Sequence, residues 1–178
     1  MICRLCPRRC GAERTAETGG GFCAMPAGIR VARAALHHWE EPPISGTNGS
    51  GAVFFSGCTL RCCYCQNHDI SAGGFGRDVT PQRLRAIFEE LIAQGAHNID
   101  LITATHFLPW LLPALTPKLP VPLVYNCGGY ESVETLRQLE GLVDIWLPDL
   151  KFTVGSVSEI LGVAEHDKGA VKHGQCQF

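Results

Sequence analysis

Short apolar runs alternate with longer segments of helical periodicity through the middle of the chain. The runs cover residues 52–57, 98–105, 122–128 and 142–148, and each ends at a glycine, a proline or a polar residue. Continuous apolar runs of this length are typical of strands that are buried on both faces, as in a parallel sheet covered by helices. We therefore predict four parallel strands in an α/β fold.

The clearest helix prediction covers residues 80–95. Thr80 is a suitable N-cap, Pro81 suits the first helical position, and Gly95 suits the C-terminal end. Two weaker helical segments follow the second and third predicted strands. The apolar residues of the first helix recur at helical spacing and predict one buried face, made of Leu84, Ile87, Phe88, Leu91 and Ile92.

The chain divides into three parts by composition. Residues 1–50 are rich in turns and cysteine and predict a small N-terminal appendage, which ends at the glycine- and serine-rich segment 47–51. Residues 51–152 contain the four predicted strands. Residues 153–178 show no strand pattern, so we expect an atypical tail that is prone to disorder. A sheet that stops at a fourth strand would have an unpaired edge, and we expect a C-terminally truncated chain.

Composition and charge narrow the classes of function. The 178 residues are 46% hydrophobic and 18% charged, with a formal net charge of −2. This balance predicts neither a nucleic-acid partner nor a membrane partner, and no apolar run reaches the roughly 20 residues that span a bilayer. We expect a cytoplasmic protein, in which the ten cysteines do not form a disulfide framework and the clustered ones serve as metal ligands.

Four of the cysteines lie within residues 57–67, which we call the cysteine loop. Cys58, Cys62 and Cys65 have the spacing C-x3-C-x2-C, with which a loop can wrap around one cubic cluster. The alternative trio replaces Cys62 with Cys63, and residues two apart in an extended loop reach a common centre less readily. We therefore predict Cys58, Cys62 and Cys65 as ligands and Cys63 as a bystander.

The number of ligands distinguishes two kinds of site. Clusters that only transfer electrons are normally held by four thiolates, so three would leave one iron of a 4Fe–4S cluster open to a substrate or cofactor. Structural zinc needs four closed ligands, for which only His68 is suitably spaced. A zinc knuckle or buried reduced thiols are the alternative at this point.

The cysteine loop resembles the radical S-adenosylmethionine superfamily. It follows a predicted strand and its glycine, it has the C-x3-C-x2-C spacing, and the aromatic Tyr64 precedes the last cysteine. The segments CQNHDIS, TATHF, YNCGGY and LPDLK are similar to those of the pyruvate formate-lyase activating enzymes and their uncharacterised relatives, over residues 1 to about 152. The resemblance implies a partial parallel (β/α) barrel with about four βα units.

The ends of the predicted strands carry the candidate cofactor-binding residues, because reactive groups in a parallel barrel gather at the C-terminal ends of its strands. Thr105 and His106 occupy the place of a Gly-Gly-Glu segment of the activating enzymes, and Asn126 occupies that of an aspartate. With Asp149 and Lys151 they form the set that the resemblance implies for binding the cofactor. No catalytic residue is assigned.

The resemblance also implies a mechanism and partners. A reduced flavodoxin- or ferredoxin-type donor would supply one electron, and cleavage of S-adenosylmethionine would release a 5′-deoxyadenosyl radical that abstracts hydrogen. The implied substrate is the glycine backbone of a glycyl-radical protein, with a small molecule as the next reading. The alternative is a non-catalytic metal-binding protein or an inactive fragment.

Four further cysteines, Cys3, Cys6, Cys10 and Cys23, lie in the appendage, and we call them the N-terminal cysteine group. Four soft ligands, two of them with C-x2-C spacing, suit zinc or a second iron–sulfur cluster. Unligated thiols are the alternative.

Overall fold

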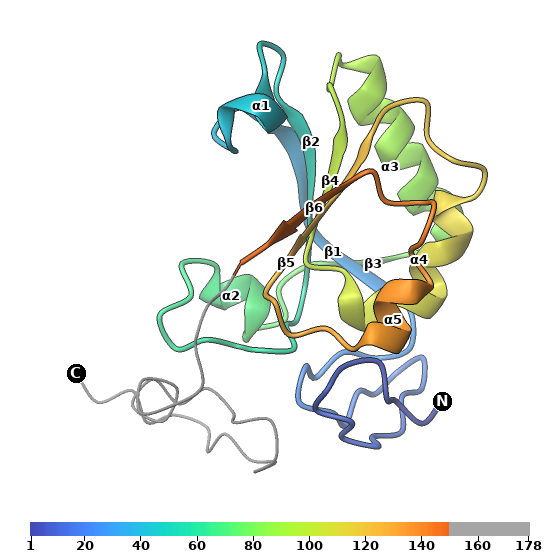
Figure 1. Ribbon diagram of the computed structural model, residues 1–178. Coiled ribbons are helices and arrows are strands. Elements are labelled where there is room, and N and C mark those ends of the chain that lie inside the picture. The colour runs from blue at the N-terminus through green and yellow to red at the C-terminus, as the bar shows by residue number, and fades with distance from the viewer. Residues whose placement is uncertain (150–178) are drawn as a thin grey trace.

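The computed structural model describes residues 1–149, and six strands of these residues form one mixed sheet (Figure 1). The strands are β1 (Ile29–His37), β2 (Ser50–Phe55), β3 (Arg77–Val79), β4 (Ile99–Ile102), β5 (Leu123–Cys127) and β6 (Ile145–Pro148). Their order in the sheet is β3-β1-β2-β4-β5-β6. Lys151 and the tail 153–178 lie outside the described residues.

The four parallel strands predicted from the apolar runs are confirmed as β2, β4, β5 and β6. These neighbours pair in parallel, with Val53 opposite Leu101, Leu101 opposite Tyr125, and Tyr125 opposite Trp146. Within the described residues they form an open sheet and no closed barrel, so the partial barrel stays a prediction.

Strands β1 and β3 were not expected. β1 pairs antiparallel with both β2 and β3. It contains Arg30 and Arg33, and a β-bulge between Val31 and Arg33 interrupts its alternation of buried and exposed positions. Because β1 precedes residue 50, the sheet includes part of the segment that the sequence assigns to the appendage.

The helices are α1 (Pro42–Ser45), α2 (His68–Ser71), α3 (Pro81–Ala93), α4 (Leu108–Leu115), α5 (Val133–Arg137) and the 3-10 helix η1 (Thr105–Phe107). The predicted helix at residues 80–95 is confirmed as α3. Thr80 Oγ1 accepts a hydrogen bond from the Arg83 N–H at 3.1 Å, which is the expected N-cap. Gly95 follows the helix with φ +97°, in the left-handed region that suits its end.

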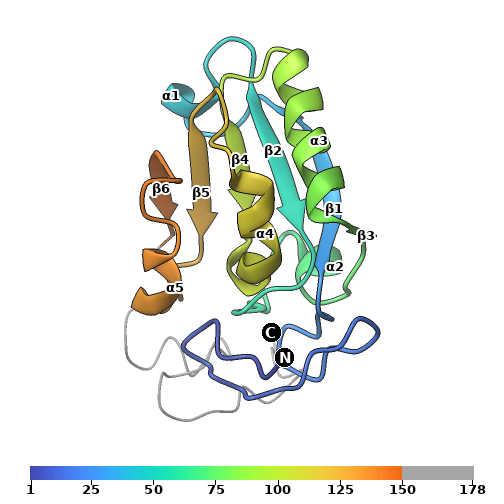
Figure 2. The same ribbon diagram turned by 90° about the vertical axis from the view of Figure 1, so that its right-hand side faces the viewer.

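Helices α3 and α4 cover one face of the sheet (Figure 2). The core between them includes Phe88, Leu111, Leu101 and Tyr125, none of which is exposed to solvent. Side chains alternate along a strand, so Asp100, next to Leu101, lies on the opposite face of the sheet. Asp100 is also completely buried.

The first 28 residues lie beyond the C-terminal ends of the parallel strands. In Figure 2 the arrowheads of β2 and β5 point toward this blue segment. The arrangement places the N-terminal cysteine group at the same end of the sheet as the cysteine loop. None of the helices in residues 1–149 has the length and apolarity needed to cross a membrane.

Candidate metal centre

The cysteine loop begins with a sharp turn after β2. Gly57 has φ +75°, and a Cβ built there would lie 2.5 Å from Met25 Cγ and 2.9 Å from the Cys23 carbonyl oxygen. Only glycine suits this backbone conformation at such a close approach. The glycine therefore lets the chain leave the sheet while the N-terminal segment packs directly against the turn.

The three predicted ligands contact one small apolar cluster. Its buried members are Leu60 and Cys62, and Cys58, Cys65 and Tyr130 pack against them. The Cys65 N–H donates to the Cys62 carbonyl at 3.1 Å, which closes the turn between these two cysteines. Cys58, Cys62 and Cys65 thus share one apolar cluster, and their role as ligands stays a prediction.

The backbone around Cys58 favours its thiolate form. The Leu60 N–H donates to Cys58 Sγ at 3.4 Å, and the N–H groups of Leu60 and Arg61 both lower the thiol pKa. Burial has the largest effect and raises the pKa of Cys58, and nearby Cys65 raises it further. A bound iron cation would stabilise both thiolates in this setting.

The side chains of the cysteine loop are not gathered around a common centre as they stand. In residues 1–149, no group of three or more His, Cys, Asp or Glu side chains is arranged so that it could hold a metal ion. The assignment of Cys58, Cys62 and Cys65 as ligands therefore depends on their spacing and on the apolar cluster that they share.

Thr105 and His106 lie at the end of β4 and are both buried. Thr105 Oγ1 lies 2.9 Å from the Tyr125 hydroxyl and donates to Glu131 Oε1 at 3.1 Å. His106 Nε2 lies 2.7 Å from the Ser56 carbonyl oxygen, next to the start of the cysteine loop. Thr105 thus links the end of β4 to β5, and His106 links it to the residue that follows β2.

His106 is held in its neutral form. Burial lowers the pKa of its imidazole from 6.5 to about 4, and nearby Arg14 lowers it further, although the Ser56 contact opposes this. With a neutral ring, the 2.7 Å contact requires Nε2 to carry the proton and donate to the Ser56 carbonyl. Nδ1 is then an acceptor, and it is buried without a hydrogen-bond partner in the described part of the chain.

Asn126 and Asp149 lie at the ends of neighbouring strands. Asn126 is half-buried on β5, and its side chain faces Asp100. The Asp149 N–H donates to the Cys127 carbonyl at 2.8 Å, directly after β6. These two candidate cofactor-binding residues therefore lie at the end of the sheet that carries the cysteine loop, whereas Lys151 falls outside the described residues.

Sequence reasoning missed three charged residues, of which Arg14 and Asp100 are buried and Glu131 is half-buried. Glu131 accepts from Thr105, and Arg14 donates to the carbonyls of Pro26 and His106. Among the described residues, none forms a regular hydrogen bond with the Asp100 carboxyl group, and burial raises its pKa to about 7. In the sequence, Asp100 is recognisable as a single carboxylate within the apolar run 98–105, but no local pattern marks Arg14 or Glu131.

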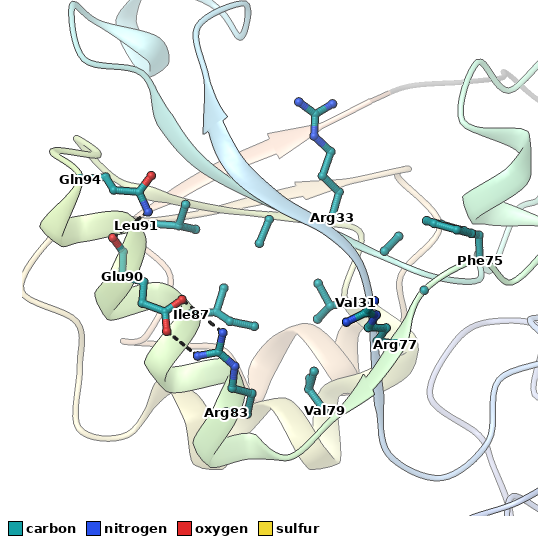
Figure 3. Close-up of a pocket in the computed structure, with 13 residues that line it drawn as sticks. Val31, Arg33, Phe75, Arg77, Val79, Arg83, Ile87, Glu90, Leu91 and Gln94 are labelled. Carbon is teal, nitrogen blue, oxygen red and sulfur yellow. Dashed lines mark hydrogen bonds and ion pairs between the residues drawn. The ribbon is translucent and has the colours of Figure 1, made fainter.

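A groove of about 500 Å³ lies away from the cysteine loop, between α3 and the strands β1 and β3 (Figure 3). Val31, Val79 and Ile87 provide apolar walls, and the Arg83–Glu90 ion pair lies on one side. Its described lining contains no cysteine or histidine. The groove is therefore separate from the candidate metal centre.

Comparison with known proteins identifies the chemistry of the cysteine loop. Residues 44–105 match the family described as a 4Fe–4S single cluster domain. This stretch contains the cysteine loop and extends from α1 to the start of η1. The match supports binding of a 4Fe–4S cluster.

Most of the chain is similar in sequence to a curated protein. An uncharacterized protein of Methanocaldococcus jannaschii is 30% identical over 159 residues, which are 84% of this chain and 45% of the relative. The chain thus spans about half the length of this relative. The similarity extends well beyond the stretch that matches the cluster domain.

Proposed function

We propose that the protein is a radical S-adenosylmethionine enzyme of the activating-enzyme type. The observation that carries the proposal is the contact of Cys58, Cys62 and Cys65 with one apolar cluster, in a segment that matches a 4Fe–4S domain. Three thiolates leave one iron of such a cluster without a protein ligand. That iron is where the amino and carboxylate groups of S-adenosylmethionine would bind.

A reduced cluster held by Cys58, Cys62 and Cys65 would supply one electron for cleavage of the bond between the sulfonium sulfur and the 5′-carbon, which would give methionine and a 5′-deoxyadenosyl radical. The residues of the chain position the reactants and exclude water. Cys62 is itself buried and Leu60 is buried beside the ligands, which limits access of water from that side. A reduced flavodoxin- or ferredoxin-type protein is the proposed electron donor.

S-adenosylmethionine would bind along the C-terminal ends of the parallel strands. Asn126 and Asp149 are proposed to contact it directly, because both lie at these strand ends beside the cysteine loop. Thr105 and His106 are proposed to act at the same site, with Thr105 linked to Glu131 and His106 linked to Ser56. Lys151 completes the proposed set.

The proposed substrate is the glycine backbone of a glycyl-radical protein. The radical would abstract one hydrogen atom from the glycine α-carbon, giving 5′-deoxyadenosine and a glycyl radical. A small molecule is the alternative substrate. Support for the protein substrate comes from the similarity of four segments, one around the cysteines and three at strand ends, to the activating enzymes.

Anaerobic reconstitution tests the proposal. The wild-type chain is loaded with iron and sulfide, reduced with dithionite and incubated with S-adenosylmethionine, and 5′-deoxyadenosine is measured by chromatography. We expect product from the wild type, none from Cys58→Ala, and wild-type amounts from the neighbouring variant Cys63→Ala. Loss of product in Cys63→Ala would contradict the ligand assignment.

Absence of product from a fully loaded wild-type chain would instead contradict the enzymatic activity. In that case the protein would be a non-catalytic iron–sulfur protein. Iron content of each variant, measured in parallel, separates loss of the cluster from loss of turnover.

A further inference from the structure

Two cysteine turns of the same form occur in the chain. Cys6-Pro-Arg-Arg-Cys10 and Cys58-Thr-Leu-Arg-Cys62 both have C-x3-C spacing. In each, the arginine before the second cysteine has a left-handed backbone, with φ +40° at Arg9 and +50° at Arg61. Few non-glycine residues adopt this conformation, so its recurrence at the same position indicates a shared local structure.

Both turns direct backbone N–H groups toward their first thiol. The Leu60 N–H donates to Cys58 Sγ, and the Arg8 N–H faces the Cys6 thiol. Leu60 and Arg8 each stand two residues after the first cysteine of their turn. The N-terminal turn therefore has the same backbone arrangement around its first thiol as the turn in the 4Fe–4S segment.

The other two members of the N-terminal cysteine group are brought to this turn by backbone contacts. The Cys3 N–H donates to the Ala12 carbonyl at 2.9 Å, and the Gly11 N–H donates to the Cys3 carbonyl at 3.1 Å. A Cβ at Gly21 would lie 3.1 Å from Cys10 Sγ, so the chain just before Cys23 packs against Cys10.

The four thiols of this group lie near one another. Cys6 and Cys23 are each close enough to Cys3 and Cys10 to interact with them electrostatically. Cys3 and Cys6 are buried. The fold thus gathers four soft ligands from residues 3–23 in one region.

We propose that the N-terminal cysteine group holds a second 4Fe–4S cluster with four thiolate ligands. Its turn matches the one in the 4Fe–4S segment in spacing and in the left-handed arginine before the second cysteine. Four thiolates leave no iron open. The second cluster would therefore transfer electrons or stabilise the fold and would not bind S-adenosylmethionine.

The two centres lie next to each other, with Arg8 between them. Arg8 Nε donates to the Thr59 carbonyl at 3.1 Å within the cysteine loop, and its guanidinium stacks on Phe22 at 3.4 Å from the ring centre. The charge of Arg8 interacts with Cys6, Cys10 and Cys58, from both groups. Arg8 Nη2 is buried without a hydrogen-bond partner among the described residues, so it is available to an anionic cluster.

Iron analysis of a chain without the first cluster tests the proposal. The triple variant Cys58→Ala, Cys62→Ala, Cys65→Ala is reconstituted anaerobically, and iron, sulfide and zinc are measured per chain. We expect about four irons and about four sulfides in this variant and about eight of each in the wild type. Adding Cys6→Ala to the triple variant should remove the remaining cluster, whereas adding Cys127→Ala should leave it in place.

Retention of one zinc ion or of no metal by the triple variant would overturn the proposal. Misfolding is controlled with the single variant Cys6→Ala, which should keep about four irons and the signal of the first cluster in electron paramagnetic resonance. This test does not depend on cleavage of S-adenosylmethionine, so its failure is distinguishable from failure of the proposed activity.

Paramagnetic resonance of the wild type tests the closeness of the two centres. With both clusters reduced, we expect spin–spin broadening that neither the triple variant nor Cys6→Ala shows. A wild-type spectrum equal to the sum of the two single-cluster spectra would overturn the placement of Arg8 between two adjacent clusters.

Discussion

Asp100 gives the stability of the protein a pH dependence of defined sign. Its carboxyl group is completely buried on β4, and burial raises its pKa from 3.8 to about 7, with Glu40 and Glu41 adding to the increase. The folded state therefore binds the proton more tightly than the unfolded state. The contribution of this group is fully present below pH 3.8 and is lost as the pH rises through about 7.

The magnitude follows from the two pKa values. The full difference corresponds to about 4 kcal/mol, of which about 1 kcal/mol is lost between about pH 6 and about pH 8. His106 acts in the opposite direction, because its pKa falls from 6.5 to about 4 in the folded state. The stability that His106 contributes is therefore lost as the pH falls from 6.5 toward about 4. The total pH dependence thus combines opposing groups, and a variant is needed to isolate Asp100.

The perturbation is Asp100→Asn, which removes the titrating group and keeps the size of the side chain. Free energies of unfolding are measured by urea denaturation of the cluster-loaded chain, under anaerobic conditions, at both pH values. From the lower to the higher pH, the wild type should lose about 1 kcal/mol of unfolding free energy relative to Asp100→Asn. Equal pH dependence in the two proteins would refute the burial of an unpaired carboxyl at this position.

Asp144→Asn is the matched control. Asp144 accepts hydrogen bonds from Lys118 Nζ at 2.7 Å and from the Leu123 N–H at 2.9 Å, which lower the pKa of its carboxyl. Stability from this group is lost only as the pH falls below its ordinary value of 3.8. The control should therefore change stability by the same amount at both pH values.

Three further substitutions probe the fold and the cysteine loop. Thr80→Ala removes the N-cap of α3 and should cost about 1 kcal/mol in urea denaturation; an unchanged midpoint would contradict the cap. Phe88→Ala leaves a cavity between α3 and the sheet and should cost about 4 kcal/mol, whereas a loss below about 1 kcal/mol would contradict its complete burial. Gly57→Ala places a Cβ against Met25 and Cys23 at a positive φ, so it should lower iron loading, and full loading would contradict the close approach.

The sequence predicts the elements whose signals are local. Thr80 and Pro81 define the start of α3, and apolar runs identify the four parallel strands. Three of these strands, β2, β4 and β5, are largely buried, whereas β6 at the edge of the sheet is partly exposed. β1 was missed because two arginines and a bulge interrupt its alternation, and because antiparallel pairing with β2 is a long-range property.

For the candidate site, too, the sequence predicts the residues with local signals but not the contacts between distant segments. Spacing alone selects Cys58, Cys62 and Cys65, and the structure brings them to one apolar cluster. Position at a strand end selects Thr105 and His106, but their hydrogen bonds to Glu131 and Ser56 arise only when distant segments pack together. The contact of Arg8 with the cysteine loop has the same origin, since it joins residues far apart in the chain.

The central claim is that the cluster at Cys58, Cys62 and Cys65 has an open iron that binds S-adenosylmethionine. The most direct measurement is electron paramagnetic resonance of the reduced, reconstituted Cys6→Ala variant with and without S-adenosylmethionine. We predict a shift of the cluster signal on addition, because the amino and carboxylate groups of the cofactor change the coordination of one iron. An identical spectrum at saturating cofactor would contradict the account.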